Sequence, residues 1–119
     1  MTDKRRPLFW EGSSKTDFKE FPVPVQKDLG VALFIAQLGR TAGSAKPWKG
    51  SGSGVFELVD DHRGGTFRAV YVVRVGDAVH VLHAFQKKSK SGIATPRADV
   101  ELIEKRLKTV LARFGRGGR

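Results

Sequence analysis

The chain has 119 residues, with 22 lysines and arginines against 12 aspartates and glutamates, and it contains no cysteine. This length is typical of one domain around one core, and a hydrophobic fraction of 39% is enough to fill that core. The lack of cysteine excludes disulfides, thiolate nucleophiles and cysteine-based zinc sites. The formal net charge of +10 favours an anionic partner, which is a nucleic acid, a membrane surface or an acidic protein.

The first predicted elements are a strand, a short helix and a long helix. An apolar run at residues 8–10 indicates the strand, and Ser14 or Thr16 can cap a short helix after it. A long amphipathic helix then runs from about Val25 to Gly39. Its predicted buried face is broad: Val25, Leu29, Ala32, Leu33 and Ala36 form one stripe, and Val31, Phe34, Ile35 and Leu38 widen it.

A glycine- and serine-rich loop at residues 41–54 separates these helices from three predicted strands. The strands are expected at residues 55–60, 66–75 and 79–85, with Gly76-Asp77 as the hairpin turn between the last two. A polar loop follows over residues 86–95, and then a final helix over residues 96–114.

The predicted order is therefore β-α-α-β-β-β-α, an α+β fold in a single domain spanning residues 1–119. In this two-layer arrangement, the helical hairpin and the C-terminal helix cover one antiparallel sheet, and the opposite sheet face stays open to a partner. Residues 115–119 are expected to form a flexible basic tail. No apolar run reaches the roughly 18 residues of a membrane-spanning helix, and no signal peptide is evident, so we expect a cytoplasmic protein with no membrane partner.

The surplus of positive charge lies in three stretches without acidic residues, at 29–56, 78–98 and 105–119. Bases near the end of a helix complement its macrodipole, so helix chemistry explains the last stretch as well as an anionic ligand does. The other two stretches flank predicted strands, where helix chemistry does not apply. They are therefore the better candidates for a binding site.

A basic cluster around the sheet follows from this placement. Lys46 and Lys49 lie in the loop before the sheet, Arg68 lies on the central strand, and Lys87 and Lys88 follow the last strand. Such cations can hold successive phosphates and stabilise the charge that develops when a 2′-hydroxyl attacks a phosphodiester, a reaction that needs no metal. Each lysine alone can equally be a solvated surface charge, whereas an arginine inside an apolar strand requires a partner.

The histidines offer little support for a metal site. His62, His80 and His83 lack metal-binding spacing, and alternation along one strand places His80 and His83 on opposite faces. His83 can act as a general acid or base near neutral pH. Its strand parity with Val79 and Phe85 equally suits a core histidine, and we predict neither metal nor cofactor.

Three segments together resemble phage-derived HigB-like toxins of the RelE/ParE superfamily of type II toxin–antitoxin modules. They are Val55-Phe56-Glu57-Leu58, Thr66-Phe67-Arg68-Ala69-Val70-Tyr71 and Val81-Leu82-His83-Ala84-Phe85-Gln86-Lys87-Lys88-Ser89. The family pattern is a strand ending in Glu-Leu, a strand carrying arginine, and a strand leading into Phe-x-Lys-Lys. The resemblance spans about residues 8–112 and includes the preceding helical hairpin.

The resemblance implies a ribonuclease that cuts mRNA, usually on the ribosome, and so arrests translation. It implies a cognate antitoxin, often of helix-turn-helix type, and contact with operator DNA only through the complex with that antitoxin. By position, Arg68 matches the arginine that contacts the scissile phosphate, Lys87 and Lys88 match the lysine pair, and Lys49 matches a basic loop position. Lys46 and Lys90 are further candidates for substrate binding, and Glu57 matches a glutamate expected to pair with one of these bases.

The resemblance leaves the general base and the target open. Some relatives carry a tyrosine or histidine near the C-terminus for proton transfer, but no such residue follows His83 here, so a lysine or His83 would have to serve. ParE-like members of the superfamily poison gyrase and lack the nuclease residues. The alternative function is therefore a non-enzymatic gyrase poison or a basic nucleic-acid-binding module, although Arg68 with Lys87 and Lys88 favours the nuclease.

Overall fold

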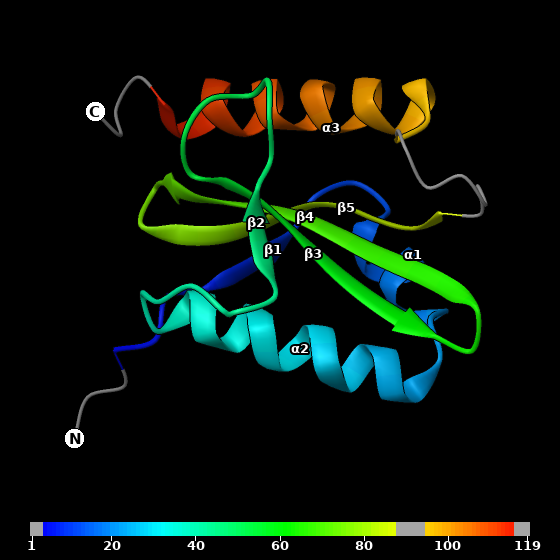
Figure 1. Cartoon of the computed structure of the whole chain (residues 1–119). Helices are drawn as coiled ribbons and strands as arrows, with labels where there is room; N and C mark the ends of the chain where they lie inside the picture. Colours follow the sequence, from blue (N-terminus) through cyan, green and yellow to red (C-terminus); the bar gives the residue numbers. More distant parts are fainter. Residues whose placement is uncertain (1–3, 88–94, 116–119) are drawn as a thin grey trace.

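The structure is a computed structural model that describes residues 4–87 and 95–115 (Figure 1). Its elements follow in chain order: β1 (Leu8–Trp10), α1 (Ser14–Lys19), α2 (Val23–Gln37), β2 (Ala45–Pro47), β3 (Val55–His62), β4 (Gly65–Val75), β5 (Ala78–Lys87), α3 (Arg97–Val110) and the π-helical turn η1 (Leu111–Gly115). The predicted α+β class is confirmed, as are the order of the predicted elements and the two N-terminal helices. No helix among the described residues is long and apolar enough to cross a membrane.

The five strands form one mixed sheet in the order β1-β5-β4-β3-β2. β1 pairs with β5 in parallel, so the prediction of a purely antiparallel sheet is wrong at this edge. The other edge strand, β2, lies inside the predicted loop. Its three residues, Ala-Lys-Pro, are too few to show alternation and include a proline, which is typical of an edge strand and invisible to a periodicity argument.

The helices cover both faces of the sheet. α1 and α2 pack on one face and α3 packs on the other, as Figure 1 shows. The two-layer prediction with one open face is therefore wrong. The cause is visible in β4, where Ala69 and Tyr71 join the core under α2 while Val70 and Val72 join the core under α3. A strand that is apolar on both sides is stable only when both sides are covered.

The inner face of α2 is as predicted, but its outer side is not. The buried residues of the helix are Val25, Leu29, Ala32, Leu33 and Ala36. Val31, Phe34 and Leu38, expected to widen this face, are exposed instead. At about 100° per residue, these three positions point away from the buried stripe, beyond the arc that a single flat sheet can cover.

A register shift in the β4–β5 pair changes which side chains of β5 face which helix. Val81 of β5 pairs with Tyr71 and His83 pairs with Val70, so Leu82 between them has no pairing partner on β4. Val81 therefore packs in the core under α2, whereas His83 and Phe85 face α3. The sequence-based placement of His80 and His83 on opposite faces is wrong for this reason, since both contact the C-terminal helical segment.

Candidate functional site

A row of charged side chains crosses the sheet on the face that carries α3. Lys46 of β2 lies opposite Glu57 of β3, and Arg68 of β4 lies opposite Val59, two residues further along β3. Lys87 of β5 lies opposite Thr66, two residues from Arg68. Because residues two apart on a strand share a face, these four side chains form one set, here called the charged row: Lys46, Glu57, Arg68 and Lys87.

The centre of the charged row is an ion pair between Arg68 and Glu57. The guanidinium Nη1 of Arg68 donates to Oε2 of Glu57, and the two side chains are only 16% and 13% exposed. The pair confirms that an arginine in this strand needs a partner and that Glu57 is paired with a base. The Nε of Arg68 is buried and has no hydrogen-bond partner among the described residues, which is unusual for a guanidinium nitrogen in a folded protein.

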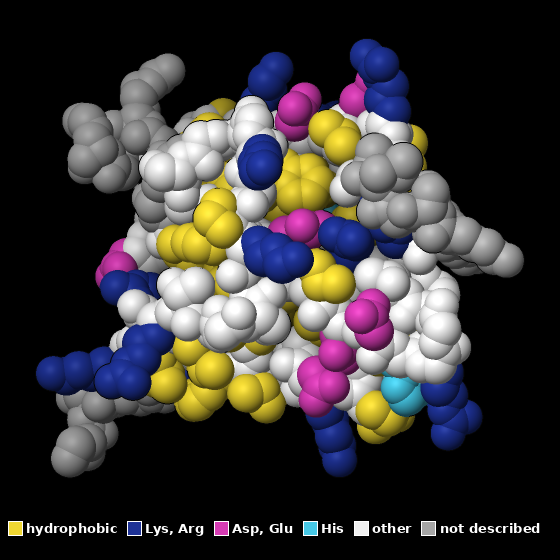
Figure 2. All heavy atoms as spheres, viewed as in Figure 1, with side chains coloured by type: hydrophobic (Ala, Val, Ile, Leu, Met, Phe, Trp, Pro, Cys, Tyr) yellow, Lys and Arg dark blue, Asp and Glu magenta, His cyan; other side chains and the backbone are white. Residues whose placement is uncertain are grey.

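A cavity of about 690 Å³ opens beside the charged row. It is lined by Lys46, Pro47, Trp48, Lys49, Glu57, Thr95 and Val100. Basic, acidic and apolar side chains also meet near the middle of the face seen in Figure 2. A volume in this range is ordinary for a ligand pocket, and the lining offers two ammonium groups, one carboxylate and an indole. This combination suits a phosphate with an attached base or sugar.

Local structure explains how the lysines reach this cavity. β2 ends at Pro47, and the backbone N–H of Trp48 then donates to the carbonyl of Val55 across the turn at 2.8 Å. The indole of Trp48 packs against the core under α3 and is half-buried. The segment is therefore held at both its backbone and the Trp48 side chain, which positions the backbone that carries Lys46 and Lys49 beside the cavity.

Lys87 and His83 are more enclosed than the sequence suggests. Lys87 is 6% exposed, so it is not an ordinary solvated lysine. His83 is 5% exposed, stacks on Phe85 and lies 2.7 Å through Nε2 from Oδ1 of Asp99 in α3. Since an ionised carboxylate only accepts, Nε2 donates this bond, and Nδ1 is buried without a partner among the described residues. His83 is thus buried, as the core alternative expected, and holds the start of α3.

The site residues divide into those brought together and those not placed. The structure brings Lys46, Lys49 and Glu57 together in the lining of one cavity, pairs Arg68 with Glu57, and places Lys87 at the end of the charged row. Lys88 and Lys90 lie outside the described residues. Sequence reasoning missed Thr95 and Val100 as lining residues, and Asp99 as the partner of His83. No local spacing connects these positions to the strands, so only the packing of α3 on the sheet reveals them.

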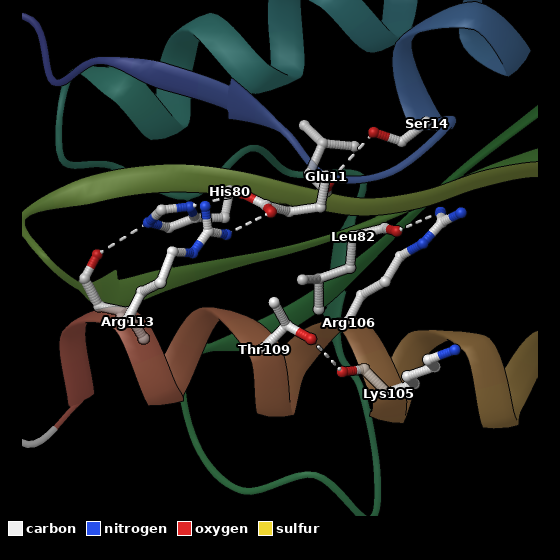
Figure 3. Close-up of polar contacts among 10 residues, drawn as sticks. Glu11, Ser14, His80, Leu82, Lys105, Arg106, Thr109 and Arg113 are labelled. Carbon is white, nitrogen blue, oxygen red and sulfur yellow. Dashed lines mark hydrogen bonds and ion pairs between the residues drawn. The ribbon is translucent and has the colours of Figure 1, made fainter.

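A second polar network lies at the other end of α3 (Figure 3). The buried carboxylate of Glu11 accepts a hydrogen bond from Nη2 of Arg113 at 2.5 Å through Oε1. Its Oε2 lies 3.1 Å from Nδ1 of His80. Nearby, Arg106 donates to the carbonyl of Leu82 at 2.8 Å and to the hydroxyl of Ser13. Two arginines of the C-terminal basic stretch therefore hold α3 and η1 to the sheet. Among the described residues, no group of three His, Cys, Asp or Glu side chains is placed to hold a metal ion.

The comparison with known families matches this chain over most of its length. The sequence profile described as "Phage derived protein Gp49-like (DUF891)" matches residues 16–108, which includes every strand from β2 to β5 and most of α3. No curated relative matches the chain. The matched family is a toxin family of toxin–antitoxin systems and lies within the RelE/ParE-like superfamily. The chain therefore belongs to the phage-derived Gp49-like family of toxins.

Proposed function

We propose that this protein is a HigB-like toxin of a type II toxin–antitoxin system that cleaves mRNA on the ribosome, and that the charged row and its cavity are the active site. The observation that carries the proposal is the position of Arg68. The mostly buried Arg68 is held in an ion pair with Glu57, and Glu57 lines the cavity together with Lys46 and Lys49. This arrangement is suited to binding a phosphodiester and stabilising added charge on it.

In the proposed reaction, the 2′-hydroxyl of the RNA attacks the adjacent phosphorus. A bond forms between O2′ and phosphorus, the bond from phosphorus to O5′ breaks, and the products are a 2′,3′-cyclic phosphate and a 5′-hydroxyl. Arg68 and the lysines stabilise the negative charge of the transition state. Every proton in this scheme moves between RNA and side chains of the chain itself.

Glu57 is the best-placed general base among the described residues. It lines the cavity, and a carboxylate at this place can accept the proton of the 2′-hydroxyl. His83, the alternative base, is enclosed and already donates to Asp99. An ammonium group of Lys46 or Lys49 then donates a proton to the leaving 5′ oxygen.

The test is expression of the protein in growing cells with mapping of transcript ends. We expect new mRNA ends within coding regions, and we expect Arg68→Ala and Glu57→Gln each to reduce cleavage about 100-fold or more. Lys15→Ala is the matched control, because Lys15 is an exposed base on α1, away from the cavity. Circular dichroism checks that each variant is folded.

Growth arrest with intact transcripts would contradict the nuclease proposal. It would favour the gyrase poison, which damaged chromosomal DNA in the same cells would reveal directly. Retention of full cleavage by folded Arg68→Ala would place the active site elsewhere.

A toxin of this family implies a cognate antitoxin. We propose that the antitoxin carries a helix-turn-helix domain and that the toxin reaches operator DNA only as part of their complex. In a gel-shift assay with the operator fragment, the complex should bind and the isolated toxin should not.

A further inference from the structure

The outer side of α2 exposes large apolar side chains. Val31 is 60% exposed, Phe34 is 42% exposed and Leu38 is 50% exposed, and all three lie on one side of the helix. In Figure 2, hydrophobic side chains gather along the lower edge, where Figure 1 places α2. Single exposed apolar residues are normal, but a continuous stripe on one helix face is typical of an interaction surface.

A glycine beside this stripe is unexplained by the fold of the chain. Gly30 lies inside α2, where glycine is less favourable than alanine by roughly 1 kcal/mol. Its φ angle is not in the positive range, and a Cβ built on it meets nothing within 4 Å. Neither backbone conformation nor packing therefore requires glycine here. What Gly30 does provide is a notch one residue before Val31, where another chain can approach the helix closely.

The charges around the stripe are basic. Lys27 is exposed on the same side of α2, the guanidinium of Arg5 lies 5.5 Å above the ring of Phe34, and exposed Arg40 follows the helix. The acid of this helix, Asp28, interacts instead with Asp60 of β3. A second copy of this chain would bring like charges together across the stripe, whereas an acidic partner would complement them.

We propose that the outer face of α2, formed by Gly30, Val31, Phe34 and Leu38, is the docking surface for a segment of the cognate antitoxin with apolar residues flanked by acids. This inference rests on the proposed function. The docking surface lies on the α2 side of the sheet, opposite the charged row under α3. The segment therefore anchors the antitoxin without entering the cavity.

The test uses the product of the reading frame that adjoins the gene for this chain, co-expressed and co-purified with it. We expect Gly30→Gln to weaken the complex about tenfold or more by filling the notch, while Gly30→Ala has a much smaller effect. Val31→Asp should weaken the complex similarly, and Thr16→Asp, which adds the same charge at an exposed position on α1, should not. Gly30→Gln and Gly30→Ala place good helix formers in α2, so loss of fold does not explain a loss of binding.

Cell growth separates this inference from the proposed function. Gly30→Gln and Val31→Asp should cleave mRNA as the wild type does but should escape neutralisation by the co-expressed partner. If the partner still binds and neutralises both variants as it does the wild type, the docking surface is wrong and the toxin function stands. If the neighbouring product never binds, the antitoxin is not the partner of this surface. The same conclusion follows if the toxin alone sediments as a dimer and Phe34→Asp makes it a monomer.

Discussion

Tyr71 shows how burial decides whether a side chain is available for chemistry. It is 1% exposed and stacks on Phe56 at 5.6 Å between ring centroids. Burial raises the pKa of Tyr71 to about 12, because the phenolate is poorly solvated in this position. The phenol thus remains neutral and packed, and it does not take the place of the C-terminal tyrosine that some relatives carry.

The only tyrosine of the chain makes this directly measurable. In the native protein, phenolate absorbance should rise with a midpoint near pH 12, whereas in urea it should rise near pH 10. The neutral phenol therefore contributes stability that is complete below about pH 10 and is lost as the pH rises toward 12. A native midpoint near pH 10 would contradict the burial of Tyr71.

Asp60 is the second residue whose environment alters its titration. Burial raises the pKa of Asp60, and Asp28 and Asp61 act in the same direction, while His62 acts against them. Because the folded state favours the protonated form, the contribution of Asp60 to stability is complete below the ordinary aspartate pKa of 3.8 and declines as the pH rises above it.

Asp60→Asn should therefore raise the melting temperature at neutral pH and have little effect near pH 3. The amide has the shape of the protonated acid but never acquires the charge that Asp28 and Asp61 disfavour. Melting curves of the variant and the wild type between pH 3 and pH 7 measure this difference. Equal shifts at both ends of that range would show that charge is not the cause.

At the scale of elements, α3 sets the wall of the cavity and is held at both ends. In the first turn of α3, Asp99 accepts a hydrogen bond from His83. Further along, Arg106 donates to the carbonyl of Leu82 in the sheet, and Arg113 of η1 donates to Glu11. Val100, next to Asp99, lines the cavity. The position of the cavity wall therefore depends on a hydrogen bond that is not itself part of the charged row.

Asp99→Ala should destabilise the protein by about 1–3 kcal/mol, because it leaves the donor of buried His83 without an acceptor. It should also raise KM for RNA more than it lowers kcat, since it moves the wall rather than Arg68. Asp99→Asn is the matched variant, because its amide oxygen still accepts the bond. Urea denaturation and steady-state cleavage measure the two effects, and an Asp99→Asn variant as impaired as Asp99→Ala would contradict this role.

The elements also show what a single sequence can and cannot predict. The inner stripe of α2 was predictable because helical periodicity and burial agree at each position. The face of His83 was not, because one bulge residue in β5 reverses the alternation without leaving a mark in the sequence. Strand order was enough to predict that Lys46, Arg68 and Lys87 lie on the same part of the sheet, whereas the Asp99 contact depends on where α3 packs.

For the whole molecule, net charge overstates the number of cations available to the proposed RNA substrate. Arg68, Arg106 and Arg113 are each engaged by a described partner. The two lysines that line the cavity, Lys46 and Lys49, make no ion pair with any residue in the described part of the chain. Binding strength should therefore reflect a small set of local contacts rather than the total of +10.

The salt dependence of RNA binding tests whether a few local contacts or the total charge determine the affinity. With cleavage-deficient Glu57→Gln and a short single-stranded RNA, the slope of log K against log salt concentration should fall in magnitude by about 0.7 when Lys49 is replaced by alanine. Lys15→Ala should leave the slope unchanged. Equal changes for the two substitutions would indicate diffuse attraction to the whole surface.

The parallel pairing of β1 with β5 has a consequence for how this toxin is made. β1 contains residues 8–10, yet its partner is β5, and Glu11 pairs with Arg113, 102 residues later in the chain. During synthesis, a chain that ends after β4 already carries Glu57 and Arg68 but has neither the strand that receives β1 nor the helix that walls the cavity. The site is complete only when β5 and α3 have emerged. Prematurely terminated products should therefore be harmless to the cell that makes them.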